Sequence, residues 1–139
     1  MAGKTDLFCF RGIMNAEFYV SILEENIADI KALMGKGWRF QQDNDPKHTS
    51  RLAKSYLESH VPKVLEWPAN SPDLNPIENI WGLVKTNVEK RMPQNLDELE
   101  SFMREEWDAI PKSTLKNVVK SMQNRCKLVI KNNGDHIDY

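Results

Sequence analysis

The sequence predicts an α/β fold in the first half of the chain and an all-helical part behind it. Three short apolar runs, at 7–10, 38–42 and 64–67, have the length and aromatic content of strands. Elsewhere apolar residues recur every three or four positions, which indicates helices with one buried face. The order strand, helix, strand favours a parallel pair of strands with a right-handed crossover.

The composition fits a single domain spanning 1–139, long enough to bury a core. We expect residues 1–6 to be frayed, 7–67 to form the strand and helix part, and 75–131 to form the helical part. The net charge is -1, so any contact with nucleic acid must come from a local patch. No apolar run approaches the ~20 residues of a membrane span, and the N-terminus lacks a secretory signal. We therefore expect an intracellular protein with no membrane partner.

The first two predicted helices have clear start and stop signals. The helix after Asn15, a predicted N-cap, ends at Gly35. Asp45 followed by Pro46 predicts the N-cap and first position of the second helix, which His60-Val61-Pro62 ends.

Three further helices are predicted after a rigid, proline-rich loop at 68–76. Their boundaries are given by caps and prolines at Asn75-Pro76, Met92-Pro93, Asn95 with Glu98, Ile110-Pro111 and Asn132-Asn133-Gly134. The buried stripe of the last helix is predicted at Leu115, Val118, Val119, Met122, Cys126 and Val129.

Two acids frame the central stretch of the chain. Asp43 follows the predicted strand at 38–42, Glu78 lies in the first turn of a predicted helix, and 34 residues separate them. Carboxylates at a strand's C-terminal end and at a helix start can converge on one point. Their oxygens suit Mg²⁺ or Mn²⁺, and a pair of such ions can activate the attacking oxygen and stabilise the leaving oxygen in phosphoryl transfer.

Each acid also has a structural alternative. Asp43 could be a loop aspartate that accepts hydrogen bonds from nearby backbone amides. Glu78 could reach back to the backbone amide of Asn75 in a capping box. Two further acids are expected to be structural: Asp45 caps a helix, and Asp73 holds the proline-rich loop in shape.

Basic side chains follow both acids and are candidates for DNA contact, because helix starts and basic groups attract phosphate. Lys85 lies almost two helical turns after Glu78, so both side chains are expected on one side of the helix. The alternative is a solvated helix face without a partner. The candidates are Lys47, His48, Arg51, Lys54 and Lys85.

Two sequence blocks resemble a known family. The block Gln-Gln-Asp-Asn-Asp-Pro-Lys-His-Thr at 41–49 and the block Trp-Pro…Ser-Pro-Asp-Leu-Asn-Pro-Ile-Glu at 67–78 resemble, in residues and spacing, the second half of the catalytic domain of Tc1/mariner-type transposases. The resemblance extends from about Leu7 to the end of the last helix. It implies a ribonuclease H-like fold, truncated here, with three metal-binding carboxylates: Asp, Asp, and Glu or Asp. Asp43 matches the second position and Glu78 the third, and the first aspartate is expected upstream of this chain.

The function that the resemblance implies is DNA transposition by metal-dependent strand cleavage and strand transfer. It also implies Mg²⁺ or Mn²⁺, transposon-end DNA, a synaptic homodimer and a nuclear location. Because one carboxylate and the N-terminal helix-turn-helix domains of such transposases are absent, we expect no turnover and no end-specific recognition by this chain alone.

Another class of function stays open: a domesticated or decayed transposase remnant that acts as a DNA- or protein-binding module. Three strands alone would leave an open sheet edge, so we also expect a homodimer or another partner to cover it.

Overall fold

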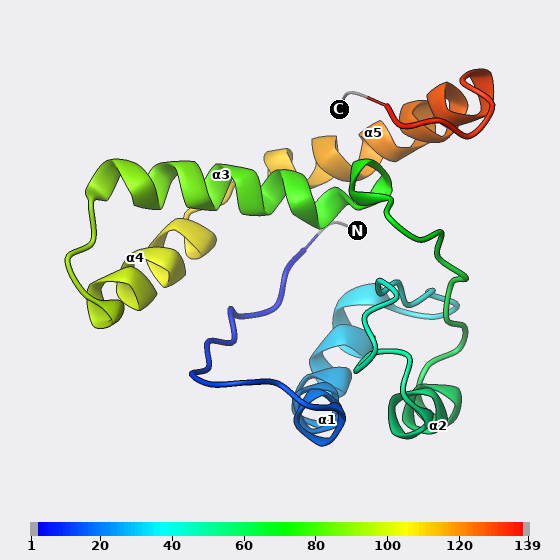
Figure 1. The fold of residues 1–139 in the computed structure, drawn as a ribbon, viewed down its shortest axis with the longest axis horizontal. Helices are drawn as coiled ribbons and strands as arrows, with labels where there is room; N and C mark the ends of the chain where they lie inside the picture. Colours follow the sequence, from blue (N-terminus) through cyan, green and yellow to red (C-terminus); the bar gives the residue numbers. More distant parts are fainter. Residues whose placement is uncertain (1–2, 138–139) are drawn as a thin grey trace. The chain divides into compact units, whose positions relative to one another are not determined.

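The computed structural model describes residues 3–137, in which helices are joined by extended segments and turns (Figure 1). Residues 1–2 of the predicted frayed segment lie outside the described residues. The elements in chain order are α1 (Ala16–Met34), α2 (Arg51–His60), a short 3-10 helix η1 (Pro72–Leu74), α3 (Pro76–Arg91), α4 (Leu96–Asp108) and α5 (Lys112–Lys131).

The prediction of an α/β, truncated ribonuclease H-like fold with about three strands is wrong, because residues 3–137 contain helices and no β-strand. The pairing that does occur is one isolated parallel bridge between Phe40 and Val64. In it, the Phe40 N–H donates to the Lys63 carbonyl at 2.8 Å, and the Leu65 N–H donates to the Phe40 carbonyl at 2.8 Å. A strand requires a repeated ladder of such bonds. Two hydrogen bonds around one residue do not make that ladder.

The apolar runs that predicted strands instead place side chains against helices. Trp38 is 7% exposed and belongs to the cluster that α1 and α2 bury. Leu7 packs against the core of the later helices, and its carbonyl accepts a hydrogen bond from the Arg104 guanidinium at 2.8 Å. Phe8 and Phe10 of the first run are 44% and 42% exposed, so the apolar runs are buried only in part.

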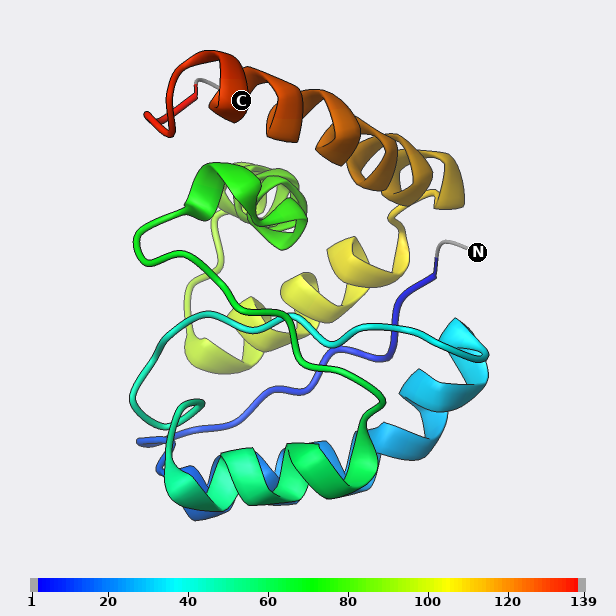
Figure 2. The same cartoon turned by 90° about the vertical axis from the view of Figure 1, so that its right-hand side faces the viewer.

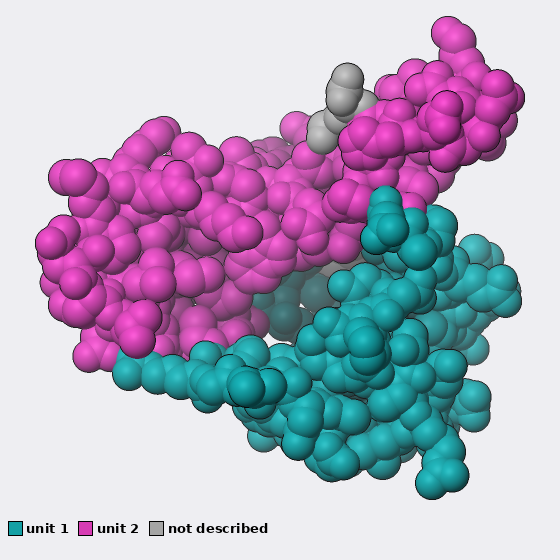
Figure 3. Space-filling model, viewed as in Figure 1, with its two compact units in different colours: residues 1, 3–5, 10–70 teal, residues 2, 6–9, 71–139 magenta. Residues whose placement is uncertain are grey.

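The chain divides into two compact units, coloured separately in Figure 3. Unit 1 comprises residues 3–5 and 10–70 of the described chain, and unit 2 comprises residues 6–9 and 71–137. In unit 1, α1 packs on α2. The buried core of unit 1 consists of Tyr19, Val20, Leu23, Ile27, Trp38, Ala53, Leu57 and Val61.

Unit 2 is organised around α3, which lies between α4 and α5 (Figures 1 and 2). The rings of Trp81 and Trp107 lie 5.2 Å apart between their centroids, so these tryptophans join α3 to α4. The buried core of unit 2 consists of Ile80, Val84, Val88, Trp107 and Leu115.

Two predicted N-caps are confirmed. Asn15 Oδ1 accepts the Phe18 N–H at 2.8 Å at the start of α1. Asn95 Oδ1 accepts the Glu98 N–H at 2.9 Å at the start of α4. In both cases the side chain satisfies a backbone donor that the first turn leaves without a helical partner.

The predicted start of the second helix at Asp45-Pro46 is wrong. Helix α2 begins at Arg51, where Ser50 Oγ accepts the Ala53 N–H at 3.1 Å. The residues before it form a turn, because the Asp45 carbonyl accepts the N–H groups of both His48 and Thr49. The proline-rich loop contains one short regular element, the η1 helix.

Candidate metal and nucleic-acid site

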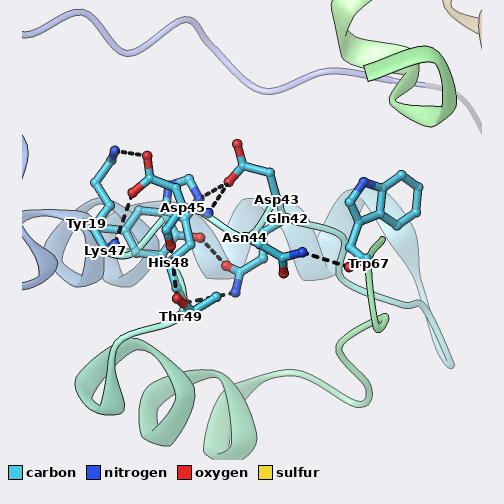
Figure 4. Close-up of polar contacts among 9 residues, drawn as sticks. All are labelled: Tyr19, Gln42, Asp43, Asn44, Asp45, Lys47, His48, Thr49 and Trp67. Carbon is cyan, nitrogen blue, oxygen red and sulfur yellow. Dashed lines mark hydrogen bonds and ion pairs between the residues drawn. The ribbon is translucent and has the colours of Figure 1, made fainter. Parts of the chain in front are cut away.

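Asp43 lies in unit 1 between the Phe40–Val64 bridge and the turn that precedes α2. Its side chain is 61% exposed. His48 Nδ1 lies 2.6 Å from Oδ1, and the Asp45 backbone N–H donates to the same oxygen at 3.1 Å (Figure 4). No residue among 3–137 bonds the other oxygen, Oδ2. Asp43 therefore accepts the local bond expected of a loop aspartate and still presents an outward oxygen.

The Asp45 carboxylate is paired with Lys47, two residues further along the chain. Its Oδ1 accepts the Lys47 N–H at 3.0 Å, and its Oδ2 forms an ion pair with Lys47 Nζ at 2.5 Å. The hydrogen bond from the Lys47 side chain is the main cause that lowers the pKa of the Asp45 carboxyl below its ordinary value. Lys47, a predicted DNA contact, is thus paired with a carboxylate in this structure.

Tyr19 and Gln42 contact His48, the residue that bonds Asp43. The Tyr19 hydroxyl donates to Gln42 Oε1 at 2.6 Å, and Gln42 Nε2 donates to the His48 carbonyl at 3.0 Å. The Tyr19 and His48 rings lie 4.2 Å apart between centroids. Burial, and then the negative charge of Asp43, raise the pKa of Tyr19 above its ordinary value, so its hydroxyl remains a neutral donor.

A cavity of about 470 Å³ opens beside Asp43 within unit 1. Its lining includes Asp43, Asn44, Lys54, Glu66 and Trp67. The Asn44 side chain fixes one wall, because its Nδ2 donates to the Trp67 carbonyl at 2.8 Å (Figure 4). The cavity thus brings a carboxylate, a cation and an aromatic surface together.

Two predicted DNA contacts on α2 are exposed and unpaired. Neither Arg51 nor Lys54 forms an ion pair with any residue of the described range 3–137. Both line a second hollow of about 380 Å³ on α2, together with Ser55 and Glu58. Their positive charges are therefore available to a ligand.

Glu78 lies in unit 2, exposed in the first turn of α3. The capping-box alternative is not realised, because the Asn75 N–H donates to the Pro72 carbonyl at 3.0 Å. Asn75 occupies the predicted N-cap position, but its side chain makes no capping hydrogen bond. No residue in the described part of the chain bonds the Glu78 carboxylate, and Lys85, also exposed on α3, has no ion pair there.

Arg125, which the sequence reasoning did not single out, fixes the start of α3. It extends from α5 and is 2% exposed. Its guanidinium donates to the Asp73 carbonyl at 2.9 Å, to Asn79 Oδ1 at 2.6 Å and to Ser121 Oγ at 3.0 Å. Asn79 is the residue after Glu78, so this buried cation holds the turn from which Glu78 projects.

The expectation that Asp73 shapes the proline-rich loop is confirmed. Its side chain is 6% exposed. One carboxylate oxygen accepts the Leu74 N–H at 3.1 Å, and the other accepts the Ile137 N–H at 3.1 Å and lies 3.3 Å from His136 Nδ1. These bonds fasten η1 to the segment after α5.

The predicted acids thus lie one in each unit, Asp43 in unit 1 and Glu78 in unit 2. Within residues 3–137, no group of three or more His, Cys, Asp and Glu side chains is arranged to hold a metal ion. In the same range, no helix has the length and hydropathy needed to cross a membrane.

A family described as DDE superfamily endonuclease matches residues 2–100. The chain is 37% identical over 123 residues to the transposase of the transposable element Tcb2 from Caenorhabditis briggsae, covering 88% of this chain and 45% of that protein. It is 41% identical over 101 residues to the Tc1 transposase of Caenorhabditis elegans, covering 73% of this chain and 37% of that protein. The chain therefore spans less than half the length of these relatives.

Solved structures with a similar fold include the Mos1 transposase catalytic domain with Raltegravir and Mn. The TM-score is 0.79 at 20% sequence identity, covering 91% of this chain and 67% of that one. The crystal structure of the catalytic domain of Mos1 mariner transposase gives a TM-score of 0.78 at 18% identity, covering 91% of this chain and 66% of that one.

Proposed function

Because this chain belongs to the DDE superfamily endonucleases, as a transposase-derived domain of the Tc1/mariner type, we propose that it serves metal-dependent DNA strand cleavage and strand transfer. The observation that supports the proposal most is the state of Asp43. Its Oδ1 is held by His48 and a backbone amide, whereas Oδ2 has no partner among residues 3–137. A carboxylate oriented in this way suits a metal ligand.

Mg²⁺ or Mn²⁺ fits the donor chemistry of the two acids. Carboxylate oxygens are the ligands that these hard cations prefer, and the Glu78 carboxylate also lacks a partner within 3–137. Asp43 and Glu78 are the residues that would hold the ions. When bound, such ions supply charge neutralisation at the phosphodiester and activation of the attacking oxygen. The similar Mos1 catalytic domain was solved with Mn and with Mg.

DNA is the proposed substrate, bound at its phosphates by basic side chains near the two acids. Arg51, Lys54 and Lys85 support this best, because they are exposed and have no ion pair within the described residues. Lys47 and His48 are also proposed to contact phosphate, and each already contacts an aspartate as well. A nuclear location and a synaptic homodimer follow from this proposed role.

The chain by itself is proposed to lack turnover, since two carboxylates leave the three-carboxylate set incomplete. A second candidate is a binding module without catalysis. It is favoured by Arg51 and Lys54, which are exposed on α2 and form no ion pair within residues 3–137.

A chimaera tests the catalytic role. This chain replaces the matched segment of the Tc1 transposase, and excision of a Tc1 element from a plasmid is measured. We expect excision, and a loss of at least about 10³-fold with Asp43→Asn or Glu78→Gln. Glu89→Gln, on the exposed side of the same helix α3, is the matched control and should keep excision. Excision that survives Asp43→Asn or Glu78→Gln would exclude the proposed role of that acid.

The purified chain alone tests the proposed lack of turnover. Incubated with duplex DNA and Mn²⁺, it should bind without nicking. Nicking that Glu78→Gln abolishes would contradict the proposed lack of turnover, whereas an inactive chimaera with retained DNA binding would favour the binding module.

A further inference from the structure

The Asp43 carboxylate is held in one orientation through one of its two oxygens. His48 Nδ1 and the Asp45 N–H both bond Oδ1, at 2.6 Å and 3.1 Å. Because an ionised carboxylate can only accept, Nδ1 of His48 carries the proton. Figure 4 shows Oδ2 pointing away from His48. The two bonds therefore leave one defined oxygen for a ligand.

His48 is itself fixed by residues from other parts of unit 1. Its ring lies against that of Tyr19, a buried residue of α1. Gln42 bonds both partners, since its Oε1 accepts from the Tyr19 hydroxyl and its Nε2 donates to the His48 carbonyl (Figure 4). The turn that carries His48 is thereby tied to helix α1, and the His48 ring is held between the Tyr19 ring and Asp43 Oδ1.

We propose that His48, held by Tyr19 and Gln42, is a positioning residue that turns Oδ2 of Asp43 toward a divalent cation. The inference rests on the proposed function, in which Asp43 is a metal ligand. A carboxylate that is already oriented loses less side-chain freedom when the metal binds. Outer partners of metal ligands typically contribute 10–100-fold in affinity, so His48 should matter although it does not touch the ion.

His48 serves Asp43 through Nδ1 alone. No residue among 3–137 bonds Nε2, so the ring can still meet a phosphate there. The positioning role is therefore compatible with the proposed DNA contact and is tested without DNA.

The test is a Mn²⁺ titration of the purified chain, in which electron paramagnetic resonance of free Mn²⁺ gives the Kd of every variant. Wherever Asp43 is present, paramagnetic broadening of the ¹³C signal of its carboxyl group shows that the ion lies at Asp43. Asp43→Asn assigns that signal. We expect His48→Ala to raise the apparent Kd about tenfold. His48→Asn should restore the Kd to within about threefold, because the Asn amide nitrogen can donate from the place of Nδ1.

His60→Ala is the matched control. His60 ends α2 in the same unit, its ring stacks on Tyr56 at 4.0 Å between centroids, and its Nδ1 contacts the Tyr56 carbonyl at 2.8 Å. Its removal should leave the Kd unchanged. A merely structural effect of His48→Ala would also appear in the thermal unfolding of the metal-free protein and would not be rescued by asparagine.

The outcomes separate this inference from the proposed function. If Asp43→Asn abolishes Mn²⁺ binding but His48→Ala leaves the Kd unchanged, the positioning role is refuted and the metal role of Asp43 stands. If Asp43→Asn leaves Mn²⁺ binding unchanged, or the wild type binds none, the metal role fails and the inference fails with it. Imidazole ¹⁵N spectra of the metal-free chain add an independent check: a His48 protonated on Nε2 alone would overturn the inference.

Discussion

Replacement of Arg125 by methionine should destabilise unit 2 markedly. Methionine fills much of the volume but leaves the Asp73 carbonyl and Asn79 Oδ1 without the donor that bonds them now. Each unsatisfied buried acceptor costs about 1–3 kcal/mol. The variant no longer buries a cation, which offsets part of this cost. We therefore expect the free energy of unfolding to fall by about 2–4 kcal/mol.

Urea denaturation followed by circular dichroism measures this change. Arg104→Met is the matched control, because Arg104 has a 45% exposed side chain whose ion pair joins Glu100 one helical turn away and whose hydrogen bond to the Leu7 carbonyl is also exposed. Such exposed pairs contribute about 0.3–0.5 kcal/mol, so the control should lose less than about 1 kcal/mol. Arg125→Lys keeps the charge but cannot make all three hydrogen bonds of the guanidinium, so its loss of unfolding free energy should lie between those of the two methionine variants. A loss below about 1 kcal/mol for Arg125→Met would refute the reasoning that this cation holds the start of α3.

Three further results are expected. Leu57 is 1% exposed, so Leu57→Ala should lower the free energy of unfolding in urea by about 2–5 kcal/mol. Leu52 is 46% exposed, so Leu52→Ala should lower it by less than about 1 kcal/mol. Equal losses would contradict the assigned core. The raised pKa of Tyr19 contributes stability that is complete below the ordinary value of 10.0 and is lost as the pH rises above it. Tyr19→Phe should therefore reduce the decrease of the urea midpoint at alkaline pH. An unchanged decrease would exclude Tyr19 as its cause. Arg51→Ala combined with Lys54→Ala should reduce the slope of log binding constant against log salt for duplex DNA by about 2, and an unchanged slope would exclude phosphate contact by these residues.

Sequence patterns predicted helices better than strands because the two signals depend on different partners. Asn15 and Asn95 cap their helices through bonds that close within three residues, so local sequence suffices to find them. The run around Phe40 becomes a strand only if other backbone segments extend its ladder, and Val64 supplies a single bridge. Apolar composition alone does not distinguish a strand from an extended segment buried against helices.

In the last helix, the apolar pattern assigned the wrong one of two neighbouring residues, Arg125 and Cys126, to the buried face. The apolar stripe predicted Cys126 on the buried face, but Cys126 is exposed and its neighbour Arg125 is buried. A charged side chain becomes buried only where distant acceptors meet it, here Asp73 and Asn79, and helical periodicity contains no information about them.

For the candidate site, the sequence indicated the two acids but not the residues that hold Asp43 in place. Asp43 and Glu78 were singled out by residue type and spacing, their metal-binding roles came from the resemblance of the two sequence blocks to the Tc1/mariner family, and those roles remain predictions. Tyr19 was not indicated as part of the site, because no local pattern shows that its hydroxyl bonds Gln42. His48 was predicted as a DNA contact from its charge, whereas the structure also places its Nδ1 on Asp43.

The central claim is that Asp43 and Glu78 are metal-binding carboxylates, and a Mn²⁺ titration followed by thermal unfolding tests it most directly. A ligand that binds the folded state at 100 times its Kd stabilises it by about 2.7 kcal/mol, so the Tm of the wild type should rise with Mn²⁺ concentration. Asp43→Asn and Glu78→Gln should each lose that rise. If all three proteins respond alike, the two carboxylates do not form a metal site in this chain, and the binding module replaces the catalytic account.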